Sequence, residues 1–363
     1  MSDGVNLPDP HDGGDAGELL RVTSLSTRFE TPTLTVTAVD DVSLTIRTGH
    51  TLGIVGESGS GKSVLSRTIM GLLPPTASVT GTVELSGHVI SGLTEKERRR
   101  FWGREIAMVF QDPMTSLNPV VRIGRQVAEA LPHDQRRSKA EAAKRVKELL
   151  TAVRIPNPGQ RLRQYPHELS GGMRQRVVIA MALAGNPNLL LADEPTTALD
   201  VTVQGQILDL LRSIQLARHM GMILVSHDLG VVAQRTEHVA VMYAGQIVEQ
   251  AATHDLFANT RMPYTLALLR SIPRMDQSRS EPLQAIGGRP PNLASLPMGC
   301  RFASRCPDAR RRCLVEAPPL VADANQPDHT YRCWYPVGTA AEYIDRDEMA
   351  ATPVAVNIGC DGR

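Results

Sequence analysis

The segment at positions 56–63 constrains the fold of this chain more than any other. It reads Gly-Glu-Ser-Gly-Ser-Gly-Lys-Ser, which matches G-x-x-x-x-G-K-[ST] without a gap. A short apolar run at 51–55 precedes it, and a helix-like run at 62–73 follows and ends before two prolines. This strand–loop–helix order argues against the alternative of an incidental turn rich in glycine and serine. The segment therefore predicts an α/β domain that binds phosphate.

The chemistry of phosphate binding accounts for the residue types in this loop. Glycines let the backbone curl so that successive N–H groups point at phosphate oxygens, and the helix N-terminus adds partial positive charge. Lys62 is expected to reach the β- and γ-phosphates, and the Ser63 hydroxyl is expected to ligate Mg²⁺. The predicted nucleotide-binding residues are Gly56, Glu57, Ser58, Gly59, Ser60, Gly61, Lys62 and Ser63.

Two adjacent acids follow another apolar run, at 189–192. Successive side chains of a strand point to opposite faces, so Asp193 and Glu194 diverge at its end. Asp193 suits the Mg²⁺ coordination sphere, and Glu194 suits the polarisation of a water for attack on the γ-phosphate. The alternative is an N-capping acid before a loop, because Asp-Glu-Pro is also typical of a helix start. The phosphate loop favours the catalytic interpretation.

Four further short segments complete a recognisable series. They are Leu-Ser-Gly-Gly-Met at 169–173, Phe-Gln-Asp at 110–112, Thr-Ala-Leu-Asp at 197–200 and Ser-His-Asp at 226–228. Each alone is weak, since Ser-Gly-Gly is commonly a turn and a histidine after a strand is commonly a surface or core residue. Together and in this order they resemble the signature, Q-loop, D-loop and H-loop of ABC ATPases. The resemblance covers about 18–250.

This resemblance implies roles for individual residues. Gln111 would contact Mg²⁺ or water and report to a membrane partner, and His227 would contact the γ-phosphate. Three signature residues would bind ATP held by an opposite subunit, and a D-loop acid would cross the dimer interface. Those four residues are Ser170, Gly171, Gly172 and Asp200. Phe29 is the candidate for stacking on adenine, with a core strand phenylalanine as the alternative.

Longer runs resemble one branch of the family, the ATPases of dipeptide and oligopeptide importers. They lie at 110–119, 173–184, 192–204, 241–248, 263–269 and 299–307. The branch implies a bacterial importer with a second ATPase subunit (a paralogue or a copy), two membrane permeases and an extracytoplasmic peptide-binding protein. Peptide is the expected cargo, and nickel and glutathione are alternatives within the same family.

The expected fold class is α/β, a P-loop NTPase (RecA-like) ABC cassette. It would carry a helical subdomain, an N-terminal antiparallel β subdomain and a small loop-rich C-terminal domain with cysteines. The expected divisions are a disordered lead at 1–17, the nucleotide-binding domain at 18–250 with a helical insertion at about 112–180, the C-terminal domain at 251–336 and a tail at 337–363. Ala142, Val146, Leu149, Leu150 and Val153 carry the helical spacing in the insertion.

Composition bears on location and partners. The formal net charge is +1, which argues against a nucleic-acid partner. The N-terminus lacks a secretory signal and no apolar run is long enough to span a bilayer, so we expect a protein docked at the cytoplasmic face of the cell membrane. A soluble ABC ATPase of DNA repair or the ribosome is the alternative. The single cassette and the absence of sustained heptads argue against it. Arg301, Arg305 and the arginines at 310–312 are interpreted as a solvated face.

Four of the five cysteines lie close together near the C-terminus, at Cys300, Cys306, Cys313 and Cys333. In a reducing compartment such cysteines are more often metal ligands than disulfides, although reduced cysteines packed as small apolar residues are the alternative. Their spacing matches neither zinc knuckles nor ferredoxins. Soft thiolates select zinc or an iron–sulfur cluster. Members of the resembled family hold a four-iron four-sulfur cluster at a similar cysteine set, which favours [4Fe–4S] over zinc, in a structural role.

Overall fold

The computed structural model describes residues 17–32, 34–112, 116–136, 138–197, 199–272 and 286–338. The lead expected at 1–17 and the tail expected at 337–363 therefore lie almost wholly outside the described residues.

The central sheet forms from the apolar runs of the sequence. Parallel strands covered on both faces are hydrophobic along their whole length, as these are. They are β3 (Thr51–Val55), β6 (Ile106–Val109), β7 (Leu189–Asp193), β8 (Gly221–Ser226) and β9 (His238–Tyr243). On the β9 side the sheet continues antiparallel through β10 (Gln246–Ala252), β12 (Thr330–Tyr331) and β11 (Val321–Ala322). Within the described ranges its order is β11-β12-β10-β9-β3-β8-β7-β6.

A second, antiparallel sheet packs beside it. Its strands are β1 (Glu18–Thr31), β2 (Leu34–Arg47), β4 (Ala77–Leu85) and β5 (His88–Val89), in the order β2-β1-β4-β5. One face of this sheet joins helix α1 (Lys62–Met70) and the central strands in a common core. The expected α/β cassette with an antiparallel β subdomain is confirmed.

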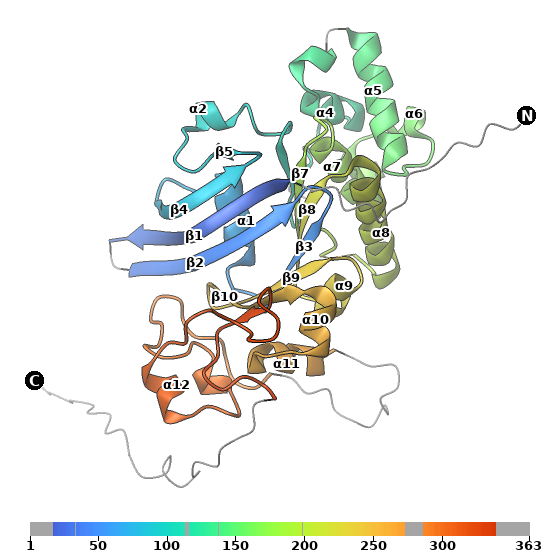
Figure 1. Ribbon diagram of the computed structural model, residues 1–363. Helices are drawn as coiled ribbons and strands as arrows, with labels where there is room; N and C mark the ends of the chain where they lie inside the picture. Colours follow the sequence, from blue (N-terminus) through green and yellow to red (C-terminus); the bar gives the residue numbers. More distant parts are fainter. Residues whose placement is uncertain are drawn as a thin grey trace, which may run out of the picture.

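Helices gather at one end of the molecule, at the opposite end from the C-terminal residues (Figure 1). They are α4 (Ile123–Ala130), α5 (Lys139–Ala152), α6 (Pro158–Arg161) and α7 (Gly171–Ala182), with short 3₁₀ turns at His133–Arg136 and Pro166–Glu168. Ser138 caps α5 by accepting a hydrogen bond from the N–H of Glu141. Val146, Leu149 and Leu150 are buried on α5, as their spacing predicts.

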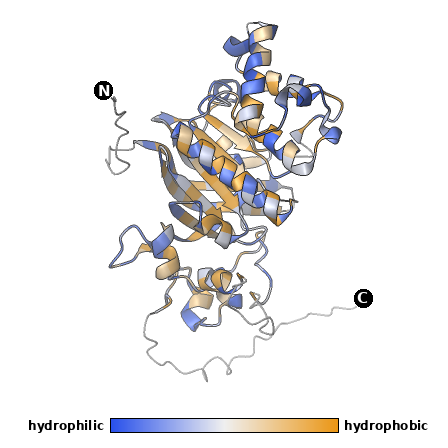
Figure 2. Ribbon diagram, turned by 90° about the vertical axis from the view of Figure 1, so that its right-hand side faces the viewer, coloured by the Kyte–Doolittle hydropathy of each residue, from blue (hydrophilic) through white to orange (hydrophobic). Residues whose placement is uncertain are grey.

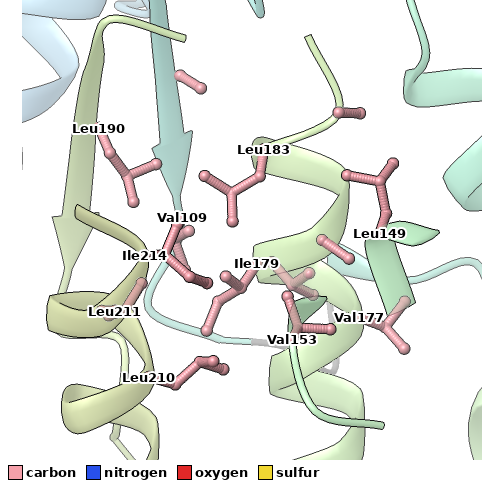
Figure 3. Close-up of a cluster of buried hydrophobic side chains, with 14 of the residues drawn as sticks. Val109, Leu149, Val153, Val177, Ile179, Leu183, Leu190, Leu210, Leu211 and Ile214 are labelled. Atoms are coloured by element: carbon pink, nitrogen blue, oxygen red, sulfur yellow. The ribbon is translucent and has the colours of Figure 1, made fainter. Parts of the chain in front are cut away.

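Helix α7 holds this end to the central sheet. Figure 3 shows its side chains between α5 on one side and α8 (Val201–Arg218) with β7 on the other. Val177 and Ile179 on α7 and Leu183 at its C-terminal cap are each fully buried. Burial of such aliphatic side chains stabilises a fold by about 1.5–3 kcal/mol each, so α7 is a rigid element.

The residues after 250 share a sheet and a core with the part of the chain that precedes them. The helices of this region are α10 (Thr253–Ala258), α11 (Pro263–Arg270) and α12 (Arg311–Val315), with a 3₁₀ turn at Ala303–Arg305. Two short helices precede it, α2 (Glu95–Arg98) and α9 (Leu229–Ala233). Strand β12 pairs with β10, and Phe302 belongs to the same apolar cluster as Val55 and Tyr243. The C-terminal region is thus packed directly onto the central sheet.

Figure 2 shows the strands of the central sheet mostly in the colours of hydrophobic residues. Among the described residues, none of the helices has the length and apolar character that crossing a membrane requires.

Candidate functional site

The parallel register brings the motifs to one edge of the central sheet. Val55 lies opposite Ser226 in the β3–β8 pair, and Asp193 lies opposite Val225 in the β7–β8 pair. The three strands therefore end at the same level. The phosphate loop after β3, the acid at 194 and the histidine at 227 follow these strand ends, so they meet at one edge.

The phosphate loop has a backbone that only glycine accommodates at two positions. Gly61 caps α1 with φ 104°, a left-handed conformation, and a Cβ there would collide with the carbonyl oxygen of Ala38. A Cβ at Gly56 would collide with the carbonyl oxygen of Met242. The loop thus lies against the β2 and β9 backbones and exposes N–H groups at the start of α1.

Lys62 is buried inside this loop. Its Nζ donates to the carbonyl oxygens of Gly56 (2.7 Å) and Glu57 (2.9 Å) and to the Ser60 hydroxyl (3.4 Å). Burial lowers the pKa of Lys62, and the nearby carboxylates of Glu194 and Asp193 act in the opposite sense. An ammonium satisfied by neutral loop oxygens can turn to phosphate oxygens, which form stronger charge-assisted bonds.

Ser63 and Asp193 form a pair with the properties of a cation site. The Ser63 hydroxyl donates to Asp193 Oδ1 at 2.9 Å, and Asp193 is 1 % exposed. Asp193 Oδ2 is buried and has no hydrogen-bond partner among the residues that the structure describes, and burial raises the pKa of this carboxyl group. A buried carboxylate oxygen beside a hydroxyl matches the oxygen ligands that Mg²⁺ prefers, so these residues fit the ion.

Glu194 is surrounded by three side chains from distant parts of the chain. Its Oε2 accepts from Gln111 Nε2 (3.0 Å) and the Thr197 hydroxyl (3.0 Å), and lies 3.4 Å from His227 Nδ1. The hydrogen bond from His227 lowers the pKa of Glu194, and the same bond raises the pKa of His227. Glu194 also has a left-handed backbone, φ 45°, and strained residues of this kind concentrate at functional sites.

The structure groups the predicted residues differently from the sequence interpretation in one respect. Gln111 was predicted to join the Mg²⁺ ligands Ser63 and Asp193, whereas its amide lies against Glu194. Its contact with Mg²⁺ stays a prediction. Thr197 is the first residue of the segment at 197–200, and nothing in a single sequence marks it as a partner of Glu194.

The signature and D-loop residues begin two helices. Ser170 caps α7 and accepts from the N–H of Met173 (3.4 Å), and Asp200 caps α8 and accepts from the N–H of Val203 (2.9 Å). Gly171 and Gly172 form the first turn of α7, where a Cβ on Gly172 would come within 2.7 Å of Val203. The two motifs are therefore packed against each other. Their role at a partner's ATP stays a prediction.

The adenine contact proposed for Phe29 also stays a prediction. Phe29 is half-buried on β1, where it pairs with Val36 on β2 and Ala77 on β4. It is absent from the fully buried core of the described residues.

Two residues that the sequence interpretation missed contact the phosphate loop from the C-terminal region. Arg305 forms an ion pair with Glu57, and the Tyr264 hydroxyl accepts the N–H of Glu57. The interpretation of Arg301 and Arg305 as a solvated face is wrong, because their side chains are 13 % and 2 % exposed and each pairs with an acid. Nothing in the local sequence distinguishes these two arginines from the exposed ones near them, because their burial follows from the fold.

The four cysteines line one small cavity of about 20 Å³, together with Met262 and Phe302. All four are free, and burial raises the pKa of Cys300, of Cys306 to about 11 and of Cys333 to about 12. Within the described ranges, no group of three or more His, Cys, Asp or Glu residues has the arrangement of a metal site. The four cysteines lie around one cavity. That they bind a metal, and which metal, stays a proposal.

Known protein families match both parts of the chain. Residues 39–197 match the sequence model of the ABC transporter family, and residues 248–313 match that of the oligopeptide/dipeptide transporter C-terminal region. One solved relative is an ATP-binding cassette in a dimeric post-hydrolysis state bound to ADP and Pi. It superposes with a TM-score of 0.58 at 29 % identity, covering 65 % of this chain and 99 % of that one.

Curated relatives are much more similar. The dipeptide transport ATP-binding protein DppD of Bacillus subtilis is 49 % identical over 87 % of this chain and 94 % of its own length. The oligopeptide transport ATP-binding protein OppD of Salmonella typhimurium is 48 % identical over 89 % of this chain and 95 % of its own length. OppD of Mycobacterium bovis is 47 % identical over 93 % of this chain, which spans 56 %, or about half, of that longer protein. The chain therefore belongs to the oligopeptide/dipeptide transporter family of ABC ATP-binding proteins.

Proposed function

We propose that this chain hydrolyses Mg-ATP and that hydrolysis drives the uptake of di- or oligopeptides through separate membrane subunits. One observation carries the ATPase proposal. The Ser63–Asp193 pair, with its unpartnered carboxylate oxygen, lies at the same sheet edge as the Glu194 cluster. The names of the relatives, which refer to oligopeptide and dipeptide transport, support the cargo.

Each residue of the site has a role in the proposed reaction. The backbone N–H groups at 56–63 and the Lys62 ammonium bind the phosphates. Ser63 and Asp193 would hold Mg²⁺, with the Gln111 amide oxygen as a further ligand, and the ion supplies positive charge against the charge that develops on the γ-phosphate. Glu194, kept ionised by its lowered pKa, orients and polarises the attacking water.

Neighbouring side chains hold Glu194 in position. Gln111 and Thr197 donate to its Oε2, which fixes the direction of the carboxylate. His227 lies on the same oxygen and is 61 % exposed, so it is free to turn toward a γ-phosphate.

The site is completed by a second ATPase subunit, a paralogue or a copy of this chain. Four residues would contact the ATP or the loops of that partner: Ser170, Gly171, Gly172 and Asp200. The helix N-terminus at Ser170 favours an anionic γ-phosphate. The dimeric state of the similar cassette bound to ADP and Pi supports this arrangement.

The proposed assembly has two membrane permeases and, indirectly, an extracytoplasmic peptide-binding protein, with this chain at the cytoplasmic face of the membrane. The match of 248–313 to a peptide-transporter C-terminal region supports it. Nucleic acid is not a proposed partner. The helical segment, with Gln111 at its start, is the proposed permease-docking surface; part of its first loop, at 113–115, lies outside the described residues.

We also propose that Cys300, Cys306, Cys313 and Cys333 ligate a structural metal centre, a [4Fe–4S] cluster in preference to zinc. Four thiols around one cavity form the donor set that such centres use, and a bound cation would reverse the effect of burial on their pKa. The preference for a cluster rests on resemblance to family members.

Protein purified without oxygen should be brown, absorb near 400 nm and carry about four irons per chain. One zinc per colourless chain would replace the cluster, and metal-free protein would leave only packed thiols.

Uptake into proteoliposomes tests the whole proposal. This chain would be reconstituted with its permeases and partner subunit and supplied with ATP and binding protein. Labelled di- or oligopeptide should accumulate only with Mg-ATP. Accumulation of nickel or glutathione in place of peptide would change the cargo. Isolation of the native chain with ribosomes or DNA and without permeases would contradict the transport function.

A further inference from the structure

Two side chains from beyond residue 260 hold Glu57, the second residue of the phosphate loop. Arg305 Nη1 lies 2.5 Å from Glu57 Oε2, and Arg305 Nη2 lies 2.9 Å from Oε1, so the guanidinium binds the carboxylate in a bidentate manner. The Glu57 N–H donates to the Tyr264 hydroxyl at 2.9 Å. Both the side chain and the backbone of Glu57 are thus fixed by the C-terminal region.

Arg305 is rigid in this position. Its side chain is 2 % exposed and donates also to the Tyr243 hydroxyl (3.2 Å) and to the carbonyl oxygens of Ile286 (3.3 Å) and Gly287 (2.8 Å). A planar guanidinium with this many partners has one orientation, in which it faces Glu57. The arrangement differs from a surface ion pair, whose long side chains are free to move.

Glu57 lies between this arginine and the lysine that binds phosphate. The carbonyl oxygen of Glu57 accepts from Lys62 Nζ at 2.9 Å, while its carboxylate accepts from Arg305. When Lys62 turns to a phosphate, the loop loses that internal bond, and Arg305 and Tyr264 keep Glu57 in place. The contacts from the C-terminal region can therefore set the shape in which the loop receives ATP.

The segment that carries Arg305 is anchored at several points. Phe302 packs against Tyr243 and Tyr264, with ring centroids 5.4 and 5.3 Å apart, and lines the cavity of the four cysteines. Arg301 binds Asp40 and the carbonyl oxygen of Ala244. Arg305 therefore lies on a segment, between Cys300 and Cys306, that these contacts hold in place.

We propose that the Cys300–Cys306 segment clamps the phosphate loop, with Arg305 as a positioning residue that neutralises Glu57 and fixes the loop for ATP. The proposal rests on the proposed ATPase function and names a control on its nucleotide affinity. Without Arg305, Glu57 would be an unpaired carboxylate beside the site of a polyanion. The clamp acts on binding and leaves the groups that activate water untouched.

The test measures binding of a non-hydrolysable ATP analogue with Mg²⁺ to the full chain by calorimetry, and KM and kcat for ATP in the assembled transporter. Arg305→Gln should weaken binding and raise KM about tenfold, equivalent to about 1.4 kcal/mol, while kcat at saturating ATP stays within about twofold. Arg305→Lys keeps the positive charge but cannot bind the Glu57 carboxylate through two nitrogens. Its affinity for the ATP analogue should therefore lie between those of the wild type and Arg305→Gln.

A double substitution separates charge neutralisation from general damage. In Glu57→Gln/Arg305→Gln the unpaired carboxylate is gone, so affinity should return to within about threefold of the wild type. Arg332→Gln is the matched control. Arg332 is 12 % exposed and binds Asp41 and the carbonyl oxygen of Ile247 at the same junction, and the hydrogen bonds found for it among the described residues include none to the phosphate loop. It should leave ATP affinity unchanged.

The outcomes are distinguishable. Unchanged affinity in folded Arg305→Gln, no recovery in the double variant, or an equal loss in Arg332→Gln would overturn the clamp. If Arg305→Gln does not fold, Arg305→Lys and the double variant carry the same test. Wild-type chain that binds no ATP would instead contradict the proposed function, whatever the variants do.

Discussion

The edge of the central sheet and the Cys300–Cys306 segment both contact the phosphate loop, but different features of the fold bring them to it. At the sheet edge, the register of three parallel strands brings together Ser63, Asp193 and the Glu194 cluster. In the clamp, Arg305 meets Glu57 across 248 residues of sequence, with no shared motif. In our two proposals the sheet edge carries out the hydrolysis of ATP, and the C-terminal segment controls the binding of nucleotide.

The strongest test of this division is Glu194→Gln. The substitution keeps the shape of the side chain but removes the charge that polarises water, so ATP hydrolysis should fall roughly a hundred- to ten-thousand-fold. ATP binding should persist, and the ATP-bound dimer should accumulate, because its release needs hydrolysis. Phosphate-release assays and size-exclusion chromatography with ATP measure the two effects.

Glu316→Gln is the control for this substitution. Glu316 is exposed and pairs with Arg312 in the C-terminal region, so the rate should be unchanged. Near wild-type hydrolysis by Glu194→Gln would contradict the role of Glu194 as the general base. It would then also contradict the proposal that the sheet edge carries out hydrolysis.

Lys62→Ala tests the phosphate loop itself, which both regions contact. Removal of the ammonium takes away charge-assisted bonds that contribute about 1.5–3 kcal/mol, so ATP affinity should fall about tenfold to more than a hundredfold. Calorimetric titration with Mg-ATP measures the loss. Lys96→Ala, at an exposed lysine, should bind ATP normally. Unchanged affinity in Lys62→Ala would mean that the loop binds phosphate through its backbone alone.

The sequence predicts the sheet edge well for a physical reason. Apolar runs at 51–55, 189–192 and 222–225 form buried parallel strands, and such strands end at one edge whatever the loops between them. Contiguous motifs at those ends therefore identify Ser63, Asp193 and His227. The orientation of Gln111 toward Glu194 depends on side-chain packing, which no spacing encodes.

The clamp was beyond prediction from one sequence. Strand β12 has two residues, too few for a periodic signal, yet its pairing with β10 attaches the C-terminal region to the central sheet. Arg301 and Arg305 stand among other arginines, so the local pattern favoured a solvated face. Their burial follows only from the fold, which places them against Asp40 and Glu57.

Cys313→Ser tests whether the cysteine cavity supports the clamp. Cys313 is 8 % exposed and its carbonyl oxygen accepts the N–H of Cys300 at 2.7 Å. A buried hydroxyl without a good partner should by itself lower the free energy of unfolding by about 1–3 kcal/mol, and loss of a thiolate ligand of the proposed metal centre adds to this. ATP affinity should fall while kcat at saturating ATP is kept. Urea unfolding and calorimetry measure both. Cys360→Ser, outside the described residues, should change neither. Lost stability with unaltered ATP affinity would separate the cavity from the phosphate loop.

The smallest expected effect concerns the His227–Glu194 pair, which belongs entirely to the sheet edge. The pKa of His227 is raised above its ordinary 6.5, so the stability it contributes is complete below pH 6.5 and is lost as pH rises through the raised value. The pKa of Glu194 is lowered below its ordinary 4.5, so its contribution is complete above pH 4.5 and is lost as pH falls through the lowered value. Lys62 and Asp228 also act on His227, in opposite senses.

The thermal unfolding temperature of His227→Gln should therefore differ most from that of the wild type between pH 4.5 and 6.5, and the difference should shrink on both sides of this window. Because His227 is 61 % exposed, the pair should contribute no more than a surface ion pair, about 0–1 kcal/mol. His254→Gln, which removes a histidine that is 90 % exposed beside Asp255, is the matched control. A difference for His227→Gln that is independent of pH would show that packing, and not charge, links the histidine to Glu194.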